Sequence, residues 1–336
     1  MSDGSARLHI ISERGVGLFS LIQQVVANIQ WAIAENRIPV VHFGDRTCYW
    51  TPHGYRGKHS VWEYYFEPLD PIYPAARIPD EIKIPISLDP PSPHEIGCRV
   101  GEDAFVSSHF GDHPQLRGAT LPIPYEWDDP SDPLRREAKA VLDNFVRPRA
   151  YIFQKVKDFF ARHMAGHYVI GVHARGTDAT SHQELRAFRQ GSLVLARYCA
   201  EIERILELQP KAKILVASDE QSSVRHLAAA FPHRVIAYHS VRHESGAAAG
   251  RGPTGWIMPA YIAGDRDVAA RNGEDAVVEC LLLSRCDHLV HNGSSLARTV
   301  LLNAPALPHT NTHRRPPELV TPPGSPEQGW PPGSGS

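Results

Sequence analysis

Apolar residues follow two spacings along this chain, and together they predict alternating strands and helices. The short apolar runs Leu8–Ser12 and Pro39–Phe43 have the length of buried strands. Between them, apolar residues of Leu18–Asn36 recur three and four positions apart, which places them on one face of a helix. A turn with two glycines, Gly15 and Gly17, joins the first strand to this helix. This order is typical of the start of a Rossmann-like unit.

The second half of the chain alternates more regularly, whereas the pattern weakens between about Gly44 and Pro133. Pro133–His163 again predicts one or two helices. The expected elements after it are strand Tyr168–Ala174, helix Leu193–Leu208, strand Lys213–Ala217, helix Glu220–Ala230, strand Arg234–Ala237, helix Glu274–Cys286, strand His288–His291 and helix Ser294–Leu302. This spacing implies an α/β fold with a parallel sheet that helices cover on both faces.

The length of 336 residues favours two domains of about 150 residues each. Arg147-Pro148-Arg149 interrupts a helical run, and we expect the chain to cross between domains there. The prediction is an N-terminal domain over residues 1–150 and a C-terminal domain over 151–306. Residues 307–336 are rich in proline and glycine, and we expect a tail that is disordered or lies on the surface.

Composition excludes several classes of protein. The net charge of −2 gives no reason to expect nucleic acid or an anionic membrane as a partner. The five cysteines are scattered and form no C-x-x-C pair, which argues against a zinc ribbon or a disulfide scaffold. The sequence has neither a signal-peptide pattern nor an apolar run of about 20 residues. We therefore expect a cytoplasmic protein.

Polar groups gather where the predicted strands of the second half end. The run YVIGVHARGTD ends one strand with His173, Arg175 and Asp178. Ligands of open α/β sheets bind at the carboxyl ends of the strands, and the planar fork of an arginine matches phosphate oxygens. This segment therefore predicts a site for a nucleotide or a nucleotide sugar.

Two further strand ends support such a site. Ser218-Asp219 follows the strand KILVA, and Asn292-Gly293-Ser294-Ser295 follows HLVH and opens a helix. Free backbone N–H groups and hydroxyls at a helix start can hold a phosphate, although a plain N-cap explains one of the serines equally well. The turn at Gly15 and Gly17 either meets a phosphate in the same way or only reverses the chain.

Three segments, HARGTD, ASDE and ECLLLSRCDHLVHNGSS, resemble the donor-binding half of GDP-fucose-dependent fucosyltransferases. The likeness is strongest to the α1,6- and bacterial nodulation fucosyltransferases and more remote to the protein O-fucosyltransferases. It covers roughly Val169–Asn303 and is weaker over Leu8–Ile38. The resemblance implies a GT-B architecture, two Rossmann-like domains facing a cleft. It also implies inverting, metal-independent transfer of a sugar from a GDP-linked donor to a carbohydrate or small-molecule acceptor, with no cofactor.

The resemblance also implies roles for individual residues. Arg175 matches the arginine that contacts the donor diphosphate, His173 a histidine near the guanine and ribose, and Asp178 an aspartate that orders the loop. Glu279 matches an aspartate that accepts hydrogen bonds from the guanine edge. The other donor-binding residues implied are Gly15, Gly17, Ser218, Asp219, Ser294 and Ser295.

The chemistry of glycosyl transfer agrees with these roles. Negative charge builds on the leaving diphosphate, and an arginine together with helix N-terminal amides can stabilise it without a metal. A general base must remove the acceptor proton. Glu184 and His182, in the loop after Arg175, are the candidates; the α1,6 enzymes carry a glutamate aligned nearer Gln183.

Two departures from the family leave alternatives open. Gly176 stands where the α1,6 enzymes have a second arginine, and Glu279 is longer than their aspartate. One alternative is a soluble natural-product glycosyltransferase that uses another GDP- or ADP-linked sugar, such as a heptose, on a small acceptor. The other is a nucleotide-binding protein without catalysis.

Several patterns favour ordinary structure over chemistry. Asp265-Arg266-Asp267 has the D-x-D form of a metal clamp, but we expect a solvated loop because no good strand precedes it. His309–His313 borders the predicted tail and is expected to be exposed loop, and Asp128-Asp129 and Asp132 lie beside prolines, as in turns. Four aromatic residues are expected to pack in the core rather than stack on a sugar: Tyr49, Trp50, Trp62 and Tyr64.

Overall fold

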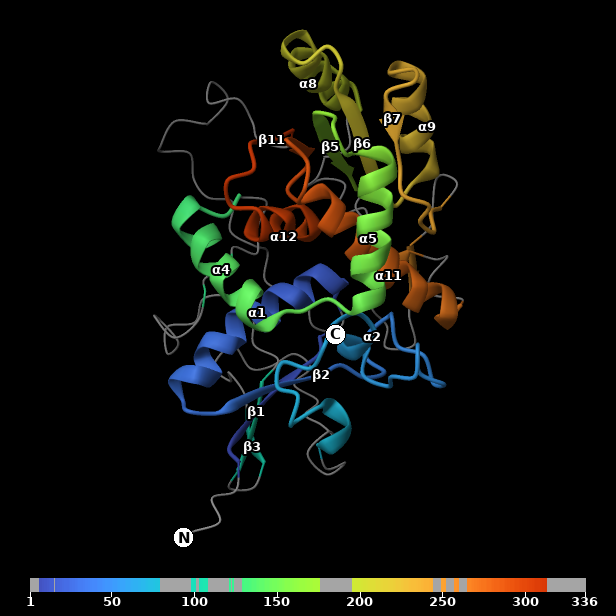
Figure 1. Cartoon of the computed structure of the whole chain (residues 1–336). Coiled ribbons are helices and arrows are strands. Elements are labelled where there is room, and N and C mark those ends of the chain that lie inside the picture. Colours follow the sequence, from blue (N-terminus) through green and yellow to red (C-terminus); the bar gives the residue numbers. More distant parts are fainter. Residues whose placement is uncertain are drawn as a thin grey trace, which may run out of the picture.

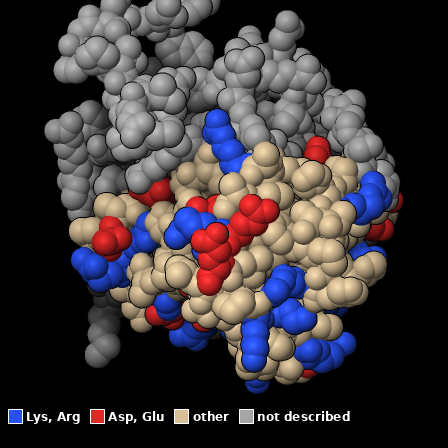
Figure 2. Space-filling model, turned by 90° about the horizontal axis from the view of Figure 1, so that it is seen from above, with Lys and Arg blue, Asp and Glu red and all other residues tan. Residues whose placement is uncertain are grey.

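Two β-sheets, one from each half of the chain, lie on opposite sides of a layer of helices (Figure 1). The computed structural model describes residues 6–14, 16–78, 98–100, 103–107, 121, 123, 129–175, 195–243, 249–251, 257–259 and 265–312. Within this part of the chain, no helix is long and apolar enough to cross a membrane. On the face that Figure 2 shows, acidic and basic side chains are interspersed, which agrees with a net charge near zero.

The N-terminal sheet has the strand order β2-β1-β4-β3. Its strands are β1 (Leu8–Ser12), β2 (Ile38–His42), β3 (Cys98–Val100) and β4 (Ala104–Ser107). Strand β1 pairs in parallel with β2 and β4, and β3 is antiparallel to β4. Helix α1 (Leu18–Ala34) connects β1 to β2 and buries most of its residues. The predicted strand, helix and strand are thus confirmed, whereas β3 and β4 fall in the segment where the pattern is weak.

The C-terminal sheet has five parallel strands in the order β11-β10-β5-β6-β7. These are β5 (Val169–Ala174), β6 (Lys213–Ser218), β7 (Val235–Ile236), β10 (His288–His291) and β11 (His309–Asn311). Strands β5 and β6 are buried along nearly their whole length, as their apolar runs predict for a sheet covered on both faces. The predicted parallel sheet is confirmed.

The longer helices after residue 130 lie close to their predicted places, except that α11 starts earlier than predicted. They are α4 (Asp132–Phe145), α5 (Ala150–His163), α8 (Leu195–Leu208), α9 (Gln221–Ala230), α11 (Arg266–Leu283) and α12 (Ser295–Asn303). The shorter elements are α2 (Val61–Tyr65), the 3₁₀ turn Ala75–Arg77 and the antiparallel pair β8 (Ala249–Arg251) and β9 (Ile257–Pro259).

Two expectations about loops need correction. The D-x-D segment is exposed as expected, but Asp265 is the N-cap of α11 and accepts from the N–H groups of Asp267 and Val268. This cap starts α11 eight residues before the predicted Glu274. The loop prediction at His309 is wrong, because His309–Asn311 forms strand β11 on the edge of the sheet. The sheet thus takes in residues beyond 306.

One hydrophobic core joins the helix layer to both sheets. Trp62 and Tyr64 are almost fully buried in it, which confirms that they pack in the core, and Tyr49 and Trp50 pack partly buried against it. Next to them, the buried Glu274 carboxylate of α11 binds Tyr55, Arg56 and Lys155. Helix α11 is thereby fixed both to α5 and to the first half of the chain.

Candidate functional site

The carboxyl ends of β5, β6 and β10 lie side by side at one edge of the C-terminal sheet. In register, His173 of β5 is opposite His291 of β10 on one side and Ala217 of β6 on the other. The polar residues that follow these strands therefore meet, as the sequence predicts.

His173 and Ser294 form the centre of this edge. The Ser294 hydroxyl lies 3.0 Å from Nδ1 of His173, and it also accepts from the N–H of Ala297 at 3.2 Å, which makes Ser294 the N-cap of α12. Burial, together with the charge of Arg175, lowers the pKa of His173 to about 3. His173 is therefore neutral at physiological pH and can exchange only neutral hydrogen bonds with a ligand.

Arg175 lies where the two halves of the chain meet. Its carbonyl accepts from the side-chain amide of Asn292 at 3.2 Å. Burial raises the pKa of Tyr49, a residue of the first half, and the charge of Arg175 acts in the opposite direction. The hydroxyl of Tyr49 in turn lies 3.4 Å from the N–H of Leu18, at the start of α1.

Ser295 connects α12 to α1. Its hydroxyl lies 2.9 Å from that of Ser20 and accepts from Arg298 at 3.1 Å. Gln23 donates to the Ser295 carbonyl at 2.7 Å and to the Thr299 hydroxyl at 3.1 Å. The side chain of Ser295 thus holds the two helix starts together, whereas Ser294 faces His173.

Gly17 is the N-cap of α1 and lies close to this junction in sequence. Its backbone is extended, with φ −63°, and a Cβ built on it would meet nothing within 4 Å. Neither conformation nor local packing therefore requires glycine here.

Arg242 connects Ser218 with Glu279. Nothing in the sequence pattern points to Arg242 as part of the site. Arg242 donates to the Ser218 carbonyl at 3.1 Å and to Oε1 of Glu279 at 2.8 Å, and Ser240 donates to the same oxygen at 2.6 Å. Burial raises the pKa of Glu279 to about 7, although Arg242 lowers it in part. No spacing rule connects position 242, in the loop after β7, with position 279 on α11.

Ser218 and Asp219 mainly order the end of β6. The Ser218 hydroxyl donates to the Ala174 carbonyl at 2.6 Å and accepts from the N–H of Glu220 at 3.1 Å. The Asp219 carbonyl accepts from the N–H of His243 at 2.9 Å. The remaining predicted residues, Gly15, Asp178, His182 and Glu184, lie outside the described residues, so their roles stay predictions.

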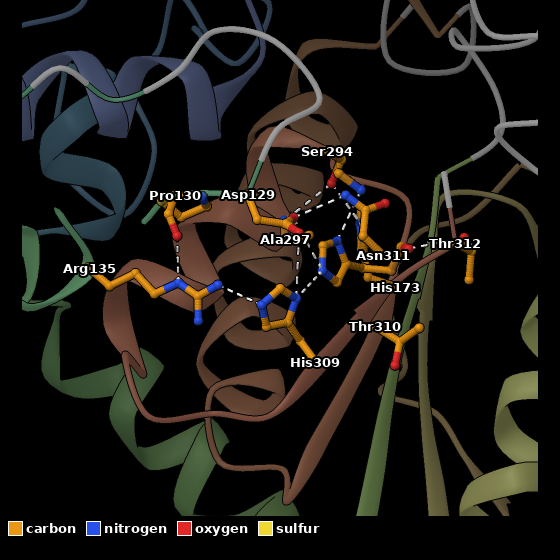
Figure 3. A network of polar contacts seen from close by, with 12 residues as sticks. Asp129, Pro130, Arg135, His173, Ser294, Ala297, His309, Thr310, Asn311 and Thr312 are labelled. Carbon is orange, nitrogen blue, oxygen red and sulfur yellow. Dashed lines mark hydrogen bonds and ion pairs between the residues drawn. The ribbon is translucent and has the colours of Figure 1, made fainter. Parts of the chain in front are cut away.

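A second polar cluster, also missed in the sequence, lies beside Ser294 and joins Asp129, His291 and His309 (Figure 3). His291 Nε2 and His309 Nδ1 are 3.0 Å apart, and they lie 3.8 and 3.9 Å from different oxygens of Asp129. Two histidines and a carboxylate are ligands that suit Zn²⁺. A metal-bound histidine, however, usually donates its other ring N–H to an acceptor.

The outer ring nitrogens of this cluster face donors instead. The N–H of Gly293 points to Nδ1 of His291 at 3.0 Å, and Nη2 of Arg135 lies 2.5 Å from Nε2 of His309. The inner nitrogens are hydrogen-bonded to each other, so at least one of them carries a proton where a metal would have to bind. This hydrogen-bond pattern does not fit a metal site.

A cavity of about 430 Å³ lies on another part of the helix layer, between α1, α4, α5, α11 and α12. Apolar side chains such as Phe19, Leu142 and Phe153 form much of its wall, and Lys139 and Arg147 contribute charge. The predicted site residues are not among its described lining, so we do not place the donor there.

Comparison with known proteins identifies the fold. No protein-family model matches the chain, and no curated protein matches it. Among solved structures, NodZ α1,6-fucosyltransferase soaked with GDP-fucose aligns with a TM-score of 0.55 and 17% identity, covering 89% of this chain and 93% of that one. The chain has the fold of the GDP-fucose-dependent fucosyltransferases.

Other fucosyltransferase structures match the same fold. NodZ from Bradyrhizobium aligns over 90% of this chain and 93% of its own, with a TM-score of 0.55 and 16% identity. POFUT1 in complex with GDP-fucose aligns over 90% of this chain and 98% of its own, with a TM-score of 0.50 and 13% identity. The expected resemblance and the GT-B architecture are thus confirmed. At such low sequence identities, the comparison establishes the fold alone.

Proposed function

We propose that this protein is an inverting, metal-independent glycosyltransferase that moves fucose from GDP-fucose to a hydroxyl or amine of a carbohydrate or small-molecule acceptor. The observation that carries the proposal is the meeting of Arg175, the His173–Ser294 pair and the start of α12 at one sheet edge, beside residues of the other half of the chain. Structures of the same fold, NodZ and POFUT1, were determined with GDP-fucose.

The donor diphosphate would lie between Arg175 and the start of α12. The free N–H groups and the dipole of a helix N-terminus favour a phosphate, and Arg175 adds a full positive charge. The buried, neutral His173 would contribute neutral hydrogen bonds to the donor rather than charge. Removal from water strengthens these interactions.

The chemical step would need no cofactor. The acceptor oxygen or nitrogen attacks the anomeric carbon from the face opposite the leaving group, and the bond from that carbon to the diphosphate oxygen breaks. The diphosphate departs with the electron pair, and Arg175 stabilises its charge. The acceptor proton passes to a general base, for which Glu184 and His182 remain the candidates.

A second candidate function differs in the nucleobase of the donor, and the contacts of Glu279 support it. A free carboxylate can accept both N–H groups on one edge of guanine. Oε1 of Glu279 already accepts from Arg242 and Ser240, which leaves less of the carboxylate for the base. This observation favours testing an ADP-linked sugar, such as a heptose, beside the GDP-linked ones.

Thermal shifts with GDP, ADP, UDP and their sugars, with and without EDTA, test the proposal together with mass spectrometry of the products. We expect GDP and GDP-fucose to stabilise the protein, by about 2.7 kcal/mol at a hundred times Kd, with no effect of EDTA. Stabilisation by ADP alone would favour the second candidate, and loss of binding in EDTA would contradict metal independence. Binding of donors without transfer to any acceptor offered would favour a non-catalytic nucleotide-binding protein.

A further inference from the structure

The cavity of about 430 Å³ between α1, α4, α5, α11 and α12 is large enough to hold a small molecule. Protein interiors are packed so closely that few voids exceed the size of a water molecule. Pockets that bind small ligands begin at about 300 Å³. The wall combines α1 and α4 with helices of the second half, so the cavity exists only where the two halves of the chain meet.

The wall of this cavity favours an apolar ligand. The Thr299 hydroxyl donates to the Ser295 carbonyl at 2.9 Å, and the Ser284 hydroxyl donates to the Cys280 carbonyl at 2.8 Å, so both hydroxyl protons are already used. Phe153 of α5 borders the space and is 40% exposed, and covering it with an apolar group would be favourable. The rest of the wall includes the apolar side chains of Phe19, Leu142, Val277 and Leu281.

The charged side chains around the cavity leave an excess of positive charge. Lys139 pairs with Asp143 on the next turn of α4, so these two charges offset each other. Arg147 and Arg285 also line the cavity, and neither has an ion-pair partner among the residues that the structure describes. Burial lowers the pKa of Arg285, as expected for a cation without a nearby carboxylate. Both arginines are exposed, so their charge lies where the cavity opens to solvent.

Arg147 is presented from a fixed stretch of backbone. Its carbonyl accepts from the N–H of Glu67 at 2.8 Å, and the next residue, Pro148, forms a bridge with Phe66. Pro148 and Phe66 themselves belong to the wall of the cavity. The connection between α4 and α5 therefore holds this cation beside the apolar space, and its position does not depend on a ligand.

We propose that this cavity is a second binding site, which takes a small carboxylic acid with an apolar body. The body would contact Phe19, Leu142 and Phe153 inside the cavity. The carboxylate would lie at the opening, where Arg147 and Arg285 supply the positive charge. This site is separate from the one proposed for the donor, and it does not depend on the proposed function.

Octanoate and 1-octanol share an apolar chain and differ in charge, so together they test the proposal. Each is titrated calorimetrically into the intact protein, below the concentration at which micelles form. We expect one saturable site for octanoate, with a Kd about tenfold lower than that of 1-octanol, the effect of two exposed ion pairs. No saturable binding of octanoate, or equally tight binding of 1-octanol, would overturn the proposal. The titration needs no donor, so it stands even if the proposed function fails.

Arg147→Gln tests the source of the charge. We expect this variant to bind octanoate about three- to fivefold more weakly and 1-octanol as before, and the addition of Arg285→Gln to remove the preference for the acid. Arg162→Gln replaces an exposed arginine of α5 that is outside the described wall, and as the matched control it should change neither Kd. Equal effects of Arg147→Gln and Arg162→Gln would contradict the proposal, because the acid would then respond only to the charge of the whole surface.

Leu281→Trp tests the cavity itself. Leu281 is half-buried in the wall, and the larger indole should fill part of the space. We expect it to weaken the binding of both probes about tenfold or more, the effect of about two methylene groups left in water. Leu208→Trp, at a side chain of α8 that is 72% exposed, is the control and should change neither Kd. Unchanged octanoate binding by a folded Leu281→Trp protein would contradict the proposal; if this variant does not fold, the comparison of Arg147→Gln with Arg162→Gln decides.

Discussion

The hydroxyl of Ser295 lies 2.9 Å from that of Ser20, although the two residues are 275 positions apart. Ser20 lies in the first turn of α1 and Ser295 in the first turn of α12, so the starts of two helices from different halves of the chain meet. Both helices direct the positive ends of their dipoles toward this junction. An anion placed there would be stabilised by both halves of the chain.

Arg175→Ala is expected to reduce kcat by about 100-fold or more, because the charge that stabilises the departing diphosphate is lost. Arg175→Lys keeps the charge but not the planar fork, and it should recover only part of the loss. Steady-state turnover of GDP-fucose with a working acceptor measures both variants. A kcat for Arg175→Ala within a few-fold of the wild type would remove this residue from the mechanism.

Gln23→Ala tests the junction between α1 and α12. Gln23 is fully buried and its amide donates to both Ser295 and Thr299, so truncation leaves two acceptors without this donor. We expect a loss of about 1–3 kcal/mol in the free energy of unfolding and weaker donor binding. Gln30→Ala, at the exposed contact with Glu137, serves as the control in the same denaturant titration. Equal stabilities of the two variants would show that the junction is not a stabilising contact.

Donor binding should depend on pH through Glu279. Its pKa is raised to about 7, so below pH 7 the carboxyl is protonated and can accept fewer N–H groups from the base. We expect the Kd for GDP to fall as pH rises from about 6 to 8, and this dependence to disappear in Glu279→Gln. His173 stays neutral across this range, since its pKa lies near 3. Calorimetric titrations at several pH values would refute the assignment if both proteins gave the same profile.

The Glu279 carboxyl should also make the free energy of unfolding depend on pH. A carboxyl whose folded pKa lies above its unfolded value of 4.5 binds more protons in the folded state between the two values. Its contribution to stability is therefore lost as pH rises from about 4.5 through 7. Relative to Glu279→Gln, the free energy of unfolding of the wild-type protein should fall across this window.

Gly273→Ala and Gly17→Ala should differ in stability, although both add one methyl group. In α11, a Cβ at Gly273 would lie 2.3 Å from the Tyr65 hydroxyl oxygen, and that hydroxyl donates to Ala270. We expect a net destabilisation of about 1–3 kcal/mol, despite the better helix propensity of alanine. At Gly17 the space is open, and the unfolding midpoint should not change. A tolerated Gly273→Ala would mean that Tyr65 shifts freely.

The polar edge of the C-terminal sheet could be predicted from the sequence because each strand and its polar end are visible in a short stretch of residues. The apolar runs that become β5, β6 and β10 are parallel neighbours, and their polar ends must meet. Arg242 and Asp129 escape prediction because their partners lie in distant segments that no sequence spacing connects with them. Strand β11 is missed because three residues among prolines are too few to show an alternation of apolar and polar positions. Only their pairing with β10 makes them a strand.

Strand β11 also decides how short this protein can be made. A chain cut after residue 306 would keep the residues assigned to the donor, yet it would remove His309 and Asn311 and leave β10 as an unpaired edge. Unpaired edge strands invite pairing with other chains. Boundaries chosen from the residues proposed to bind the donor would therefore yield a protein prone to aggregate.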